Sequence, residues 1–125
     1  MGLLVEGRWV ERWYETSKGG RFVREGSAFC NSVTRDGSAG PTGSASFRAE
    51  AGRYHLYVGY ACPWAHRVLI YRSLKGLDEA IGVGAAHWFI GSDGWTFASD
   101  EVGIVADKLG DAEFLREIHK RAKSD

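Results

Sequence analysis

The pattern of apolar and polar positions shows its first clear element at Tyr54. From there the chain reads Tyr-His-Leu-Tyr-Val, an aromatic and β-branched run that is typical of a strand buried on both faces. Gly59 ends this run, and Pro63 follows with the fixed backbone angle that suits the first turn of a helix. The pattern therefore predicts a strand over residues 54–58 and a helix that begins at Pro63.

The predicted helix has apolar residues at helical spacing and a clear end. Its stripe consists of Ala65, Val68, Leu69 and Leu74. Basic residues lie in its last turn, and Gly76 is placed to terminate it. A second strand is expected within residues 81–89, although Gly82 and Gly84 weaken its pattern.

A loop rich in Gly and Asp is expected over residues 91–110, and its length suggests a function. Asp111 is expected to cap a second helix. The apolar stripe of that helix consists of Phe114, Leu115, Ile118 and Ala122. Charged residues occupy the opposite face, so this helix is expected to lie on a sheet.

The order strand, helix, strand, loop and helix predicts an α/β fold in which the two strands pair in parallel through a right-handed crossover. Such a pair normally needs further strands, with helices on both faces. We therefore expect the sequence to be a fragment or a truncated product, or to be completed by a partner.

Residues 1–53 show no sustained helix or strand period and are interrupted by Gly, Ser and Thr. They are expected to form an extended N-terminal arm. Their aromatic residues argue against free disorder: Trp9, Trp13, Tyr14, Phe22, Phe29 and Phe47. The arm is expected to pack onto the body, and the alternative is a flexible leader with partly exposed aromatic side chains.

Composition excludes several classes of protein. The 125 residues suffice for one domain, and sixteen basic residues balance sixteen acidic ones, which gives no field to attract nucleic acid or an anionic membrane. No apolar run is long enough to cross a membrane, and no signal segment follows Met1. Two cysteines cannot form a disulfide framework, so a reducing, cytoplasmic location is expected.

Cys62 is the candidate for chemistry because it stands at the start of the predicted helix. Unpaired backbone N–H groups and the helix dipole there favour a thiolate. The alternative is a small buried apolar side chain, as free cysteines often are. Ala65 stands where a dithiol oxidoreductase carries its second cysteine, so a mixed disulfide at Cys62 would need an outside thiol such as glutathione.

The run from Gly52 to Ile70, with Cys-Pro-Trp-Ala-His-Arg from Cys62, resembles the signature of glutathionyl-hydroquinone reductases, the Xi class of glutathione transferases. The likeness continues to the Asp-Gly-Trp-Thr-Phe stretch around Trp95 and covers roughly residues 45 to 121. It implies a thioredoxin-like fold, that of the glutathione transferase N-terminal domain. Residues 54–125 would form part of this domain, without the C-terminal helical domain.

The resemblance implies that Cys62 is the nucleophile that becomes glutathionylated, and that Trp95 lies against bound glutathione. A loop anchor that packs on the core is the alternative role for Trp95. The implied reaction is the glutathione-dependent reduction of glutathionyl-hydroquinones, and the intact family member is expected to be a homodimer.

Two other functions stay open. One is an omega-like thioltransferase or dehydroascorbate reductase, and the other is a catalytically inactive fragment. The family's cis-proline strand and helical domain would follow beyond Asp125.

Two weaker signals do not predict a binding site. Cys62 and His66 have the spacing of a metal-binding pair, but the remaining histidines lack zinc spacing, so no metal is expected. The Gly-Val-Gly run from Gly82 begins like a dinucleotide fingerprint, but His87 stands where a third glycine is needed.

Overall fold

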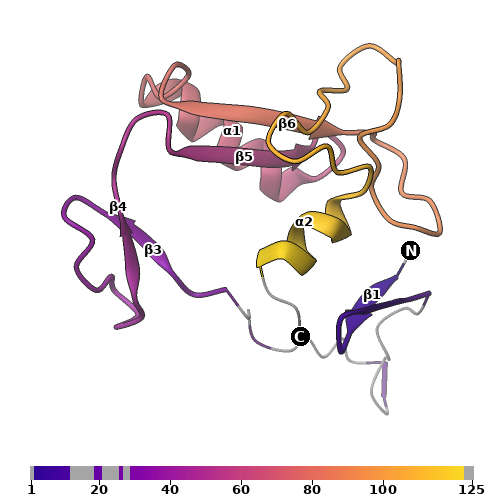
Figure 1. Ribbon diagram of the computed structural model, residues 1–125, viewed down its shortest axis with the longest axis horizontal. Helices are drawn as coiled ribbons and strands as arrows, with labels where there is room; N and C mark the ends of the chain where they lie inside the picture. Colours follow the sequence, from indigo (N-terminus) through magenta and orange to yellow (C-terminus); the bar gives the residue numbers. More distant parts are fainter. Residues whose placement is uncertain (1, 12–18, 21–25, 27–28, 123–125) are drawn as a thin grey trace.

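The computed structural model describes residues 2–11, 19–20, 26 and 29–122 (Figure 1). Along this part of the chain the elements are β1 (Leu3–Val5), β2 (Arg8–Val10), β3 (Ser32–Thr34), β4 (Ser46–Arg48), β5 (Tyr54–Gly59), α1 (Pro63–Leu74), β6 (Ile81–Ala86) and α2 (Leu115–Ala122). The expected strand, helix, strand, loop and helix after the arm are therefore present.

The central unit is a parallel pair of strands joined by α1. β5 pairs with β6 in a register that runs from Tyr54 opposite Ile81 to Gly59 opposite Ala86. Gly76 adopts a φ of 63° just after α1, the left-handed conformation that ends a helix and that glycine tolerates best. The predicted parallel pair and the predicted end of the helix are confirmed.

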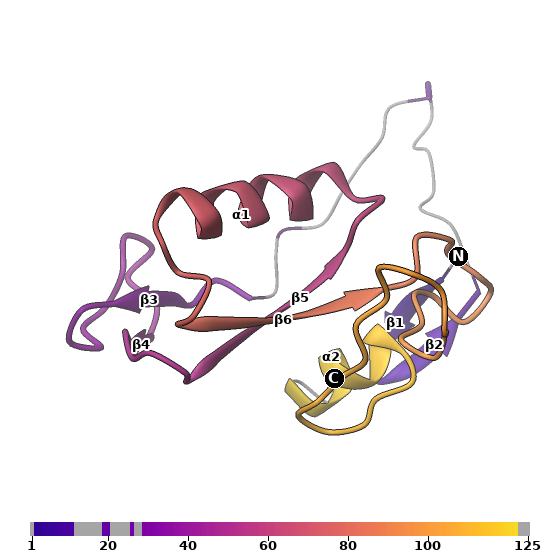
Figure 2. The same ribbon diagram turned by 90° about the horizontal axis from the view of Figure 1, so that it is seen from above.

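The two faces of this sheet carry different layers, as Figure 2 shows: α1 lies on one face, whereas α2 and the 91–110 loop lie on the other. Side chains alternate between faces along a strand, so His55, Tyr57 and Gly59 share one face. That face meets the loop, because the Tyr57 and Phe97 rings lie edge to face with centroids 5.7 Å apart.

The glycines of β6 fit the rings of β5. In the register of the sheet, His55 is opposite Gly82 and Tyr57 is opposite Gly84. A Cβ added to Gly82 would lie 2.6 Å from Nδ1 of His55, and one added to Gly84 would lie 3.0 Å from Cδ1 of Tyr57. The residues that weaken the strand pattern in the sequence therefore leave space for two aromatic side chains of the neighbouring strand.

The buried residues gather where the end of the sheet meets the loop. Within the described residues the buried apolar ones are Val58, Ala85, Ala86, Phe97 and Ala112. One acidic residue, Asp107, is buried among them. Among the same residues, no helix is long and apolar enough to cross a membrane.

The apolar stripe expected on α1 is partly wrong. Val68 and Leu74 are 47% and 76% exposed, and no residue of α1 is buried. The other two residues of the predicted stripe, Ala65 and Leu69, are half-buried, and Arg72 shares their helical face. Leu74 is nine residues beyond Ala65 and so lies about 180° around the helix from it.

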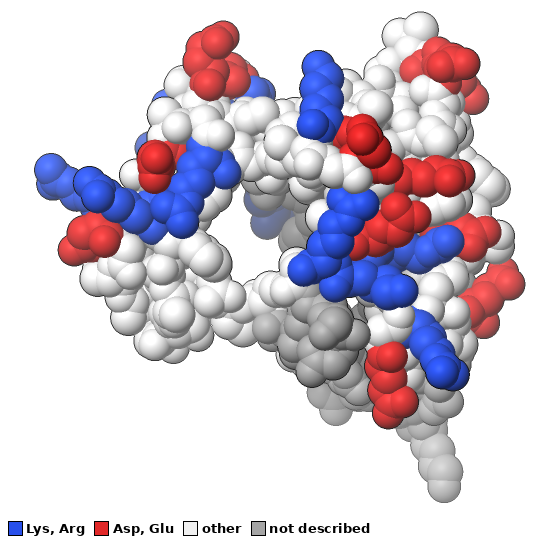
Figure 3. All heavy atoms as spheres, in the orientation of Figure 1, with Lys and Arg blue, Asp and Glu red and all other residues white. Residues whose placement is uncertain are grey.

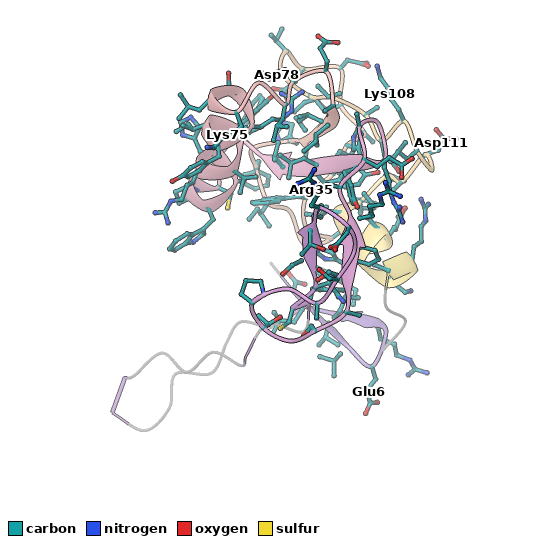
Figure 4. The ribbon with its side chains drawn as sticks, turned by 90° about the vertical axis from the view of Figure 1, so that its left-hand side faces the viewer. Glu6, Arg35, Lys75, Asp78, Lys108 and Asp111 are labelled. Carbon is teal, nitrogen blue, oxygen red and sulfur yellow. The ribbon has the colours of Figure 1, made fainter. Side chains whose placement is uncertain are left out.

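Asp111 does not cap α2, contrary to expectation. The helix begins at Leu115, and Asp111 lies outside it with a φ of 49°. Figure 4 places Asp111 at the outer side of the loop. The side chain of Glu117 takes part of the capping role, because its Oε2 accepts a 3.1 Å hydrogen bond from the backbone N–H of Glu113.

The expected stripe of α2 is visible for Phe114, Leu115 and Ile118, which are half-buried, whereas Ala122 is exposed.

The first 53 residues contain two short strand pairs. β1 and β2 form an antiparallel hairpin, and β3 and β4 pair in parallel. Trp9 of the hairpin donates a hydrogen bond to the backbone carbonyl of Ser92 in the 91–110 loop, whereas Phe29 and Phe47 are about half exposed. The aromatic residues Trp13, Tyr14 and Phe22 lie outside the described residues.

Candidate active site

Cys62 occupies the turn between β5 and α1. Its backbone N–H donates a 2.9 Å hydrogen bond to the carbonyl of Gly59, and its own carbonyl accepts the first helical bond, 3.1 Å from His66 N. The backbone of Cys62 is extended, with φ −90° and ψ 115°, and Pro63 follows in the first turn. Cys62 is therefore the N-cap residue, as the sequence predicts.

The Cys62 thiol is half-buried and makes no capping hydrogen bond. N–H groups of the first helical turn lie near a residue at this position, and the first turn carries no acidic side chain. The start of a helix in general favours negatively charged groups. The guanidinium of Arg67, which could add positive potential, lies over the exposed ring of Trp64 at 5.1 Å from its centroid.

Trp95, which belongs to the 91–110 loop, packs against the same turn. A Cβ added to Gly59 would lie 2.9 Å from Cζ3 of the Trp95 indole, so the ring rests on the Gly59 backbone, three residues before Cys62. The carbonyl of Trp95 accepts a 2.9 Å hydrogen bond from Leu115 N. The tertiary structure thus brings the two predicted site residues to one end of β5.

The indole nitrogen of Trp95 is buried and has no hydrogen-bond partner within the described residues. Buried polar groups in proteins nearly always have a partner. Within the described residues this N–H is therefore a buried donor without an acceptor, on the ring that packs against Gly59.

Asp107 organises the loop behind this turn, and the sequence analysis did not find it. It is only 4% exposed. Its Oδ1 accepts hydrogen bonds from the Tyr57 hydroxyl at 2.7 Å and from Leu109 N at 2.9 Å, and its Oδ2 accepts one from Ala112 N at 2.9 Å. Arg121 lies 3.7 Å from the same carboxylate. One carboxylate therefore joins β5, the loop and α2.

These bonds shift two pKa values in opposite directions. Burial alone raises the pKa of Asp107, but the hydrogen bonds from Ala112, Tyr57 and Leu109 outweigh it and lower the pKa to about 2. Burial, followed by the hydrogen bond to Asp107, raises the pKa of Tyr57 to about 12. At neutral pH the pair is a phenol that donates to a carboxylate.

A cavity of about 310 Å³ opens along the loop that carries Trp95, but neither Cys62 nor Trp95 lines it. Its walls include His87, Asp93, Thr96 and Phe114. Nε2 of His87 lies 3.2 Å from Oε1 of Glu101 at its edge. The cavity is therefore a separate feature from the turn that holds Cys62.

Surface charge and metal ligands add no further site. Acidic and basic side chains are interspersed on the face shown in Figure 3, in keeping with sixteen of each sign in the chain. Among residues 2–11, 19–20, 26 and 29–122, no three His, Cys, Asp or Glu side chains come together as metal ligands.

A parallel strand, helix, strand unit with a cysteine at the start of its helix defines the class of fold: a thioredoxin-like domain of the glutathione transferase type. No family model matches the sequence. The solved structure of an Xi-class glutathione transferase from Natrialba magadii superposes on 100% of this chain, with a TM-score of 0.79 and 41% identity, and the match spans 35% of that chain.

Curated relatives define the family more closely. Glutathionyl-hydroquinone reductase YqjG of Escherichia coli is 49% identical over 98% of this chain, and glutathionyl-hydroquinone reductase PcpF of Sphingobium chlorophenolicum is 46% identical over 98%. Glutathione S-transferase omega-like 2 of Schizosaccharomyces pombe is 41% identical over 86%.

A glutathione-bound structure of YqjG matches 74% of this chain and 30% of that chain, with a TM-score of 0.70 and 47% identity.

The chain belongs to the Xi class of glutathione transferases, the family of the glutathionyl-hydroquinone reductases, and corresponds to their N-terminal portion. It spans 38% of the length of YqjG, 36% of PcpF and 32% of the omega-like protein.

Proposed function

We propose that the protein reduces glutathionyl-hydroquinones with glutathione, through a mixed disulfide on Cys62. One observation carries the proposal: Cys62 is the N-cap residue of α1, and the Trp95 indole rests on Gly59 of the same turn. A nucleophile and a flat apolar surface with an unpartnered N–H are thereby placed at one end of β5. The relatives named as glutathionyl-hydroquinone reductases supply the substrate class.

The reaction proceeds in two displacements. The Cys62 thiolate attacks the sulfur of the glutathionyl group, which forms an S–S bond and breaks the bond from that sulfur to the quinol ring. The ring carbon keeps the bonding electrons and takes a proton, so the hydroquinone leaves in reduced form. The thiolate of a second glutathione attacks the glutathione sulfur of the mixed disulfide, which releases oxidised glutathione and restores Cys62.

Trp95 is proposed to bind glutathione rather than to anchor the loop alone. Its ring already packs on Gly59, and its buried N–H needs an acceptor that no described residue provides. Glutathione carries carboxylates and peptide carbonyls that accept hydrogen bonds.

The remaining proposals concern the intact protein. Residues 54–125 form part of the thioredoxin-like domain, residues 1–53 form an arm, and the intact protein is a homodimer with a further helical domain. Because the chain spans 38% of YqjG, activity belongs to the intact protein in this proposal.

The test is turnover by the intact protein with a glutathionyl-hydroquinone and glutathione. We expect release of the hydroquinone and, when the second glutathione is withheld, a glutathione adduct on Cys62 that mass spectrometry detects. Cys62→Ser should abolish both, and Cys30→Ser is the matched control. Turnover that survives in Cys62→Ser would disprove the assignment.

One alternative function has an observation in its favour, the 41% identity to an omega-like glutathione transferase. An omega-like thioltransferase or dehydroascorbate reductase would use the same cysteine. Faster turnover of a simple mixed disulfide or of dehydroascorbate than of a glutathionyl-hydroquinone would favour it, whereas no turnover of any of them would favour an inactive remnant.

A further inference from the structure

The β1–β2 hairpin contacts the loop that leads to Trp95, although the two are more than eighty residues apart in sequence (Figure 2). The indole N–H of Trp9 donates a 2.8 Å hydrogen bond to the carbonyl of Ser92. The ring of Trp9 also covers Gly94, because a Cβ added there would lie 3.1 Å from its Cη2. Trp9 therefore holds the loop on both sides of Asp93.

Arg116 of α2 closes the same cluster from the other side. Its guanidinium lies over the Trp9 ring, 5.4 Å from the centroid, and over the Phe114 ring at 4.3 Å. Nη1 of Arg116 also donates hydrogen bonds to the backbone carbonyl of Asp93 and, at 2.9 Å, to its Oδ1. The hairpin, the loop and α2 meet at this point.

The loop residue that Trp9 covers, Gly94, directly precedes Trp95 in the chain. Gly94 has a φ of 91°, a conformation open to glycine, whose backbone is the most flexible of all residues. Without a neighbour, such a residue would let the loop adopt several conformations. Packing on the Trp9 ring restricts Gly94, and Trp95 then lies with its indole on Gly59.

We propose that Trp9 is a positioning residue for the glutathione site: through Ser92 and Gly94 it keeps the Trp95 indole on the turn that holds Cys62. The inference rests on the proposed function for the role of Trp95 as a glutathione contact. Within the described residues, no hydrogen bond or ring contact joins Trp9 to Gly59 or Cys62.

The test compares Trp9→Ala and Trp9→Phe with the intact wild-type protein. Trp9→Ala should raise KM for glutathione by roughly tenfold, while the alkylation rate of Cys62 by iodoacetamide stays within about twofold, because only the binding surface moves. Trp9→Phe keeps a ring over Gly94 and loses the bond to Ser92, so its effect should be smaller. Arg8→Ala, an exposed neighbour on β2, is the control and should change neither value.

Amide hydrogen exchange provides a second readout that needs no glutathione. In Trp9→Ala, exchange of residues 92–97 should accelerate at least several-fold, while the β5–β6 ladder exchanges as in the wild type. Unchanged exchange over 92–97 would overturn the positioning role, and so would an equal loss of protection throughout the molecule in both Trp9 variants. A wild-type protein that neither binds nor consumes glutathione would overturn the proposed function, and the exchange result would then decide the contact on its own.

Discussion

At the scale of single residues, backbone contacts rather than neighbouring side chains fix the position of Cys62. The extended Cys62 and the bond from its N–H to Gly59 place the sulfur at the start of α1, and Pro63 leaves no N–H in that first position. Asp107 has the opposite character, because its effect comes entirely from side-chain bonds to three separate groups.

Cys62 should react with iodoacetamide faster than Cys30 at neutral pH, by about tenfold or more. The reason is that N–H groups at the start of α1 stabilise negative charge on its sulfur, whereas Cys30 lies in a segment without a helix. Peptide mapping after brief alkylation measures both rates in one sample. Equal rates would contradict the proposed nucleophile.

Asp107→Asn should destabilise the fold, by about 2 to 4 kcal/mol, because the amide cannot accept all three hydrogen bonds in a buried site. Tyr57→Phe removes only one of these bonds and should cost about 1 kcal/mol. Denaturant unfolding of the intact protein measures the change in unfolding free energy for both variants. If Asp107→Asn were no less stable than the wild type, the carboxylate would not organise the loop.

The same carboxylate predicts a pH dependence. The folded pKa of Asp107 lies below its ordinary 3.8, at about 2, so the unfolded state binds the proton more readily. Its stabilisation is therefore complete above about pH 4 and is lost as the pH falls towards 2. The difference in unfolding free energy between the wild type and Asp107→Asn should shrink across this window, and a constant difference would contradict the shift.

At the scale of elements, glycines let the two strands and the 91–110 loop pack closely. Gly82 and Gly84 of β6 leave room for the rings of β5, and Gly59 leaves room for the Trp95 indole. α1 is joined to β6 by Arg72, whose Nε donates a 2.8 Å hydrogen bond to Ile81 O and whose Nη1 pairs with Asp78 at 2.6 Å. In Figure 4, Asp78 and Lys75 lie at the same end of α1.

Gly82→Ala should destabilise the fold by about 1 to 3 kcal/mol, because the new Cβ would lie 2.6 Å from Nδ1 of His55 in a paired strand. Gly91→Ala is the matched control, since a Cβ there meets nothing within 4 Å and the residue has no positive φ. Thermal unfolding compares the two. Equal midpoints would show that β6 adjusts without cost.

At the scale of the whole molecule, much apolar surface remains open. Trp64, Val68, Tyr71 and Leu74 of α1 are 68%, 47%, 60% and 76% exposed. The sheet has two strands, and beyond them β6 has only an isolated bridge from Ala85 to Val105 within the described residues. Exposed apolar patches and open strand edges favour association.

The 125 residues by themselves should therefore be poorly soluble or only partly ordered, and should bind glutathione weakly. Few apolar side chains of the described residues are buried, so little burial is available to offset the roughly 1 to 2 kcal/mol per residue of backbone entropy that ordering costs. Amide exchange and glutathione titration on the purified chain measure both properties. Slow global exchange in a monomer, with tight glutathione binding, would contradict this prediction.

The sequence by itself determined the elements around Cys62. The apolar run from Tyr54, the proline after Cys62 and the glycine after α1 each act on residues next to them in sequence, so local physical chemistry suffices to place the strand, the turn and both ends of α1. The same block of residues carries the signature of the family in the sequence.

Tertiary structure alone decided the contacts between distant segments. Nothing near Asp107 signals that Tyr57, fifty residues earlier, will donate to it, and nothing near Trp9 signals Ser92. The face that α1 turns inward was also decided there, because apolar residues surround that helix and only packing on β5 selects among them. Periodicity reports what one element can bury, whereas the partner across the fold determines what it does bury.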